Sequence, residues 1–126
     1  MRNLWAGRIL SVLAILFLLF DAAAHLIVPA QVVDAFTRLG FPINLSTVLG
    51  IIELVCLIVY AIPRTSILGA ILLTGYLGGA VATHLRVRDP LFDTLFPIII
   101  GVLVWAGVYL RDQRLRALIP LTEKSN

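Results

Sequence analysis

The fold is decided by long apolar segments such as residues 67–83, ILGAILLTGYLGGAVAT, which contain no charged side chain. Three similar segments accompany this one, and we predict membrane spans at residues 9–28, 45–62, 67–84 and 95–110. A helix needs roughly 17–25 residues to cross the hydrocarbon core of a bilayer. Because lipid cannot satisfy unpaired backbone groups, the segments predict an all-α fold: an integral membrane four-helix bundle, with residues 1–126 as a single transmembrane domain.

The composition agrees with lipid as the solvent. Of the 126 residues, 60% are hydrophobic and 13% are charged, whereas soluble domains have about 25% charged residues. The chain has a net charge of +3, but its basic residues flank the apolar segments instead of clustering. This pattern is typical of membrane proteins, so we expect a lipid bilayer and no nucleic acid as a partner. The single cysteine, Cys56, excludes a disulfide scaffold.

The distribution of Lys and Arg predicts the orientation. With four spans, seven basic residues lie on the side of both termini and three on the other side. This bias favours an N-in and C-in, multi-pass arrangement. The start also resembles a cleavable signal peptide, with Arg2, Arg8 and then Ala22–Ala24 after an apolar run. Cleavage would discard Asp21, so we expect the first segment to remain as a helix.

Two flanking stretches are amphipathic and predict short interfacial helices. Residues 29–39 place an apolar face opposite an Asp34–Arg38 pair, and Gly40 is suited to end this helix. Residues 111–121 repeat the pattern with three arginines. Both stretches are expected to lie in the headgroup region of the membrane.

Polar side chains within the spans converge on the outer half of the predicted bundle. Threading four helices places Asp21, His25, Glu53, His84 and Arg86 at similar depth, with Asp21 and His25 on one helical face. A charge at mid-bilayer costs at least ~2.5–3.5 kcal/mol, so such groups usually face the bundle interior and have partners. The sequence therefore predicts a polar pocket there.

Three interpretations of this pocket remain open. In the first, it is a purely structural network of Asp21–His25 and Glu53–Arg86 pairs. In the second, it is an acid/base site. In the third, its residues are the ligands of a divalent metal. No HExxH motif or comparable ligand spacing occurs, so we expect no metal site. In the third span, we expect the Gly75–Gly79 pair to let helices pack closely within the bundle, and we favour this use over dimerisation of two chains.

One run of the sequence resembles a known family. The stretch PRTSILGA (residues 63–70), continuing as LLTGYLGGA (72–80) and THLR (83–86), is similar to the DoxX-like family of small bacterial membrane proteins. The stretches LGIIEL (49–54) and 101–116 resemble its flanking motifs. The resemblance implies a four-helix bundle in the bacterial cytoplasmic (inner) membrane. His25 departs from the lysine expected in an Asp-x-x-x-Lys pattern, which would make the Asp21–His25 pair titratable.

The leading functional prediction is binding of a small or amphipathic molecule, a quinone or a lipid, by a membrane component of a redox or envelope-stress system. The alternative is an intramembrane enzyme for isomerisation, cyclisation or hydrolysis, and a small proton-coupled transporter is third. A second copy of the chain or a membrane redox protein would be the macromolecular partner, and no cofactor is assigned. The candidate ligand-binding residues, of which the first three are also the candidate catalytic residues, are Asp21, His25, Glu53, Thr74, Tyr76, His84 and Arg86.

Overall fold

The computed structural model describes residues 2–122 and residue 124, and all regular structure within them is helical. The four long helices are α1 (Arg2–Ile27), α3 (Leu45–Ala61), α4 (Ser66–Arg86) and α5 (Leu91–Arg111). The short elements are α2 (Ala30–Leu39), the 3-10 turn η1 (Pro63–Thr65) and α6 (Gln113–Arg116). The predicted all-α membrane bundle is thereby confirmed.

The four predicted spans fall on the four long helices. Three of these helices are long and apolar enough to cross a membrane: α1, α4 taken together with η1, and α5. Helix α3 is apolar but has only 17 residues, which is the lower end of the spanning range. Large apolar side chains cover the outside of the bundle, and Phe20 and Ile27 are each 77% exposed. Such a surface fits lipid and not water.

Two boundaries differ from the prediction. Helix α5 begins at Leu91, about one turn before residue 95, so Pro97 lies inside the helix. At that position its missing N–H leaves a carbonyl of the preceding turn without a helical donor. The amphipathic pattern of residues 111–121 predicts one interfacial helix, but α6 has four residues and Leu115 is buried in the core.

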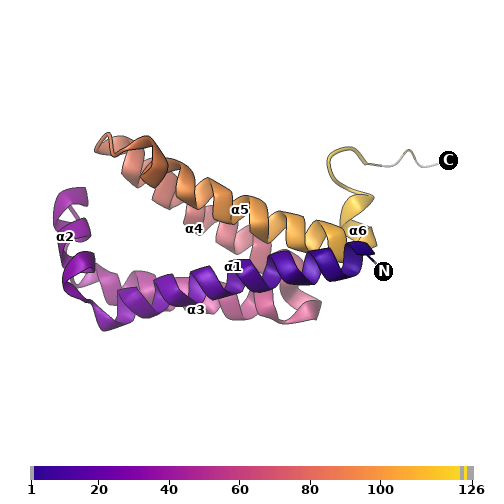
Figure 1. Cartoon of the computed structure of the whole chain (residues 1–126), viewed down its shortest axis with the longest axis horizontal. Coiled ribbons are helices and arrows are strands. Elements are labelled where there is room, and N and C mark those ends of the chain that lie inside the picture. Colours follow the sequence, from indigo (N-terminus) through magenta and orange to yellow (C-terminus); the bar gives the residue numbers. More distant parts are fainter. Residues whose placement is uncertain (1, 123, 125–126) are drawn as a thin grey trace.

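The helices form a ring in the order α1, α3, α4, α5, with α5 packed against α1. Figure 1 shows that the pair α1 and α3 lies close to the pair α4 and α5 near the N-terminus and α6, and that the two pairs diverge toward α2. We call the first region the closed end, which includes Ser11, Tyr60 and Val104. We call the second the open end, which includes α2 and the connection between α4 and α5.

Close contacts hold the closed end together. The Tyr60 hydroxyl donates to the Val104 carbonyl at 2.8 Å and lies 2.8 Å from Ser11 Oγ, which links α3 to α5 and α1. A Cβ atom added at Gly69 would lie closer than 3.0 Å to the Tyr60 backbone, and one at Gly107 would meet Ser11 equally closely. Only glycine allows these helices to approach so far.

The glycines in the middle of α4 behave differently. A Cβ atom added at Gly75, Gly78 or Gly79 would find no atom within 4 Å beyond its own surroundings in the helix. The prediction that the Gly75–Gly79 pair packs against a neighbouring helix is therefore wrong. Because α4 diverges from α1 and α3 at this level, the missing side chains leave open space beside the helix.

Candidate functional site

A cavity of about 600 Å³ lies at the open end. Its wall comes from all four long helices, and residues of α2 and the following turn also line it. Pockets for small molecules typically measure ~300–1,000 Å³ and have mostly apolar walls with a few polar groups. Most of this wall is likewise apolar, and its aromatic members are Phe17, Phe36, Phe41, Tyr76, Phe92 and Phe96.

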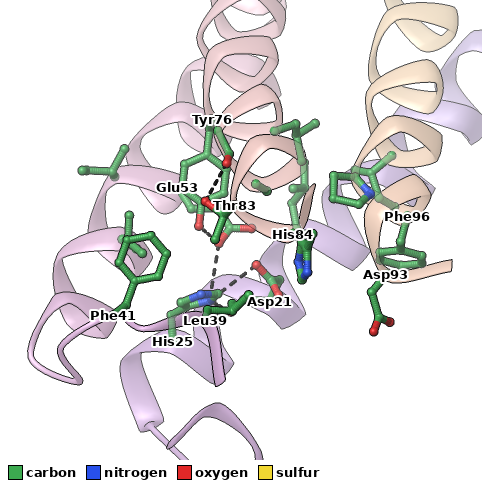
Figure 2. A pocket seen from close by; sticks show the side chains of 18 of the residues that line it. Asp21, His25, Leu39, Phe41, Glu53, Tyr76, Thr83, His84, Asp93 and Phe96 are labelled. Atoms are coloured by element: carbon green, nitrogen blue, oxygen red, sulfur yellow. Dashed lines mark hydrogen bonds and ion pairs between the residues drawn. The ribbon is translucent and has the colours of Figure 1, made fainter. Parts of the chain in front are cut away.

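Four side chains form a connected polar cluster in this cavity: Asp21, His25, Glu53 and Tyr76 (Figure 2). His25 Nδ1 lies 3.4 Å from Asp21 Oδ2 and 3.8 Å from Glu53 Oε2. The Tyr76 hydroxyl donates to Glu53 Oε2 at 3.1 Å. Helices α1, α3 and α4 thus each contribute to the polar cluster, and Asp21 and His25 share one face as the sequence predicts.

Glu53 is the most enclosed member of the polar cluster. Its side chain is 0% exposed, compared with 17% for His25 and 54% for Asp21. Glu53 Oε1 is buried and has no hydrogen-bond partner among the described residues. An unpartnered buried polar atom is costly, so Glu53 Oε1 does not stabilise the fold through a hydrogen bond of its own.

Two small residues of α3 position the cluster, and sequence reasoning missed both. The Ser46 hydroxyl donates to the His25 backbone carbonyl at 2.7 Å. A Cβ atom at Gly50 would lie 2.9 Å from His25 Cβ, so glycine is what allows α1 to approach α3 here. Ser46, Gly50 and Glu53 are spaced four and three residues apart and so share one helical face. That spacing was the signal available in the sequence.

His84 lines the same cavity, but its hydrogen-bond partner lies outside the polar cluster. Its Nδ1 donates to Asp89, which also receives the guanidinium of Arg38 from α2. The hydrogen bond from His84, and to a lesser extent the nearby Arg38, hold the pKa of Asp89 below its usual value. We call the Arg38–Asp89 and His84–Asp89 contacts the mouth ion pairs. Arg38 thus bonds across to the α4–α5 connection instead of pairing with Asp34 as predicted.

Two of the predicted site residues do not reach the cavity. The Arg86 guanidinium donates to the Leu39 carbonyl and lies 5.9 Å from the centre of the Phe41 ring. The predicted Glu53–Arg86 pair is therefore wrong. Thr74 lies in a separate groove of about 530 Å³ along α4 and α5, where it accepts a hydrogen bond from Trp105 Nε1 at 2.6 Å. We call this the α4–α5 groove.

The charges around the cavity are unbalanced. Among the described residues, its wall includes three carboxyl groups and two histidines but no lysine or arginine. The third carboxyl group, Asp93, points away from the polar cluster (Figure 2). The arrangement can accept hydrogen bonds and cations or exchange protons, and Asp21, His25 and Glu53 are the residues placed to hold a metal ion.

The comparisons with known proteins give one match. A model of the DoxX-like family matches residues 9–107, which include every member of the polar cluster. No curated protein and no solved structure matches the chain.

Proposed function

This chain belongs to the DoxX-like family of membrane proteins, and we propose that it binds a small amphipathic molecule as the membrane component of a redox or envelope-stress system. The single observation that carries the proposal is the cavity at the open end. Its apolar, aromatic wall suits an isoprenoid or acyl chain, and its polar cluster suits the head of the same molecule. Among such molecules, a quinone fits best.

The charge of the wall supports a quinone over an anionic lipid. A phosphate headgroup is normally held by Arg or Lys, and neither lines the described part of the cavity. A quinone head is neutral and needs hydrogen bonds to its oxygens. The Tyr76 hydroxyl would supply one by exchanging its Glu53 acceptor for a quinone oxygen, and the His25 ring lines the same cavity.

Titration with decylubiquinone tests this proposal. Purified protein in nanodiscs is expected to bind this quinone saturably, with one site per chain. Gly75→Leu and Gly79→Leu place a side chain in the open space beside α4 and are expected to weaken binding at least tenfold. Because no atom lies within 4 Å of either added Cβ, both variants are expected to melt no lower than the parent.

Gly78→Leu is the matched control. Gly78 lies on the same helix with equally open surroundings, but it lines the α4–α5 groove and not the cavity. The affinity of the Gly78→Leu protein for decylubiquinone is expected to stay within twofold of the parent value. Absence of saturable binding, or equal losses in Gly78→Leu and Gly79→Leu, would contradict the proposed site.

We also propose that the open end faces away from the cytoplasm of a bacterial cell and that both termini lie inside. The seven-to-three distribution of basic residues supports this orientation. In a Cys56→Ser background, a cysteine at the exposed Asn44 is expected to react with an impermeant thiol reagent on intact cells. A cysteine at the exposed Arg64 is expected to react only after permeabilisation. The reverse labelling pattern would overturn the orientation.

A second candidate function is acid/base catalysis within the membrane. It is favoured by the contact between the imidazole of His25 and two carboxylates, of which Glu53 is fully buried. A general acid or base must lie within hydrogen-bond reach of its substrate. Recovery of a chemically altered molecule after incubation with membrane lipid extracts, lost in Glu53→Gln, would favour catalysis over binding.

A further inference from the structure

Three potential metal ligands from two helices meet at the polar cluster. We propose that Asp21 and His25 of α1 and Glu53 of α3 bind one divalent transition-metal ion. The sequence gives no local metal motif because Glu53 lies 28 positions after His25 along the chain. The three ligands come together only because α1 and α3 pack side by side.

The spacing of the donor atoms fits a single ion. One nitrogen of His25 and one carboxylate oxygen from each acid lie within 4.8 Å of one another. His25 Nδ1 is 3.4 Å from an oxygen of Asp21 and 3.8 Å from one of Glu53. Around a tetrahedral ion with bonds of about 2.0–2.2 Å, neighbouring donor atoms are roughly 3.3–3.6 Å apart. Both distances from His25 Nδ1 lie within a few tenths of an ångström of this range.

Charge and hydrogen bonding also indicate a missing cation. Asp21 and Glu53 form ion pairs only with His25 among the described residues, and no lysine or arginine lines the cavity. Glu53 Oε1 is buried without a hydrogen-bond partner. A divalent ion would neutralise both carboxylates, and it would give Oε1 a partner if the Glu53 carboxylate bound it through both oxygens. Buried charges are normally either paired or bound to metals.

The supporting residues resemble the outer shell of a metal site. Tyr76 donates to the Glu53 carboxylate, and the carboxylate ligands of metal sites are themselves usually hydrogen-bonded. His25 Nδ1 lies 2.8 Å from the Asp21 backbone carbonyl, and binding an ion through this nitrogen would release that hydrogen bond and its proton. Ser46 and Gly50 hold α1 against α3 at the level of His25. The ligands therefore sit on two helices whose spacing is already fixed.

The donor set defines the class of ion. One imidazole nitrogen and two carboxylate oxygens suit Zn²⁺, Fe²⁺ or Mn²⁺, and the absence of a thiolate among them disfavours Cu⁺. Three protein ligands leave at least one coordination position open, as in catalytic zinc sites. That position would face the cavity, where water or an oxygen of a bound molecule completes the shell.

The test uses Co²⁺ and Zn²⁺ alone, without any quinone. Protein purified in detergent and stripped with a chelator is expected to bind one equivalent of Co²⁺ with the intense visible absorption of a low-coordinate site, and Zn²⁺ is expected to displace it. Glu53→Gln and His25→Ala are expected to weaken binding more than 100-fold, which exceeds the roughly 10–100-fold cost of losing an outer-shell partner. Gly50→Ala keeps all three ligands but moves α1 from α3, so a loss of about 10–100-fold is expected.

The controls separate this site from other carboxylates and from misfolding. Asp93→Asn and His84→Gln alter groups in the cavity wall outside the ligand set and are expected to change Co²⁺ affinity less than twofold. His25→Lys replaces the ligand with a permanent positive charge between the carboxylates, so it is expected to keep the parent melting temperature and lose Co²⁺ binding. Metal content below one equivalent, or equal affinity in parent and His25→Lys, would overturn the proposal. Because quinone is absent, neither result depends on the proposed function.

Discussion

The two ends of the bundle use the same residue type for opposite purposes. At the closed end, Gly69 and Gly107 bring helices into contact at distances that any side chain would prevent. At the open end, Gly75 and Gly79 touch no neighbouring helix and line the cavity. A glycine-rich helix in a membrane protein therefore indicates either close packing or open space. The course of the neighbouring helices decides between them.

The largest expected effect is a loss of stability caused by a substitution at the closed end. In Gly69→Ala, the new methyl group would lie closer than 3.0 Å to the Tyr60 backbone, which cannot move easily. Overpacking of this kind lowers the free energy of unfolding by about 1–3 kcal/mol. Reversible unfolding in mixed micelles, followed by circular dichroism, measures this change.

Gly79→Ala is its counterpart at the open end. Here the methyl group meets no atom within 4 Å, and replacing a mid-helix glycine by alanine stabilises a helix by about 0.5–1 kcal/mol. The two substitutions should therefore change stability in opposite directions. A loss of stability of equal size in both variants would remove the distinction between the two ends.

Removing single hydroxyl groups is expected to change the free energy of unfolding less than Gly69→Ala does. Tyr60→Phe removes the hydrogen bonds to Val104 and Ser11 in the buried closed end, and should lower the free energy of unfolding by about 1–2 kcal/mol. Thr83→Val removes a hydroxyl whose one hydrogen bond within the described residues goes to the Gly79 carbonyl of its own helix. That change should stay within about 0.5 kcal/mol. The same unfolding assay compares the two variants.

The smallest effect concerns the mouth ion pairs and their pH dependence. The pKa of Asp89 is lowered in the folded protein. Its contribution to holding α2 is therefore fully present above the unfolded pKa of about 3.9 and is lost as the pH falls through the lowered folded value. The protection factors of the α2 amides, which are exchange rates corrected for their intrinsic pH dependence, should fall over that acid range. In Asp89→Asn, protection should be lower at neutral pH and should lose this pH dependence, whereas a parent-like profile would show that Asp89 does not hold α2.

Much of the polar site follows from helical spacing. Asp21 and His25 are four residues apart, and the depth of Glu53 in the second span places it near them. Helical spacing also argues against the prediction that Thr74 lines the cavity. Residues two apart on a helix point in different directions, so Thr74 and Tyr76 could not both face the cavity. His84 follows Tyr76 by eight residues and therefore lies on the same side of the helix. It lines the cavity wall.

Other features could not be predicted because they depend on how the helices diverge. Arg86 has a long, flexible side chain, and its partner is a backbone carbonyl at Leu39 that no sequence pattern marks. The unfilled space beside Gly75 and Gly79 exists because α4 diverges from α1 and α3 at that level. A small-residue motif carries no information about that divergence.

The ring order of the helices also has a consequence for biosynthesis. Helix α5, the last long helix to be made, packs against α1, the first. Arg111 Nε donates to Ser11 Oγ across 100 residues of sequence, and Tyr60 needs the Val104 carbonyl of α5 as its acceptor. During translation, α1, α3 and α4 must therefore wait in the bilayer with one side of the ring uncovered. Until α5 enters, the hydroxyls of Ser11 and Tyr60 have each other as partners but lack the Val104 carbonyl and Arg111, so the last long helix completes the polar contacts of the closed end.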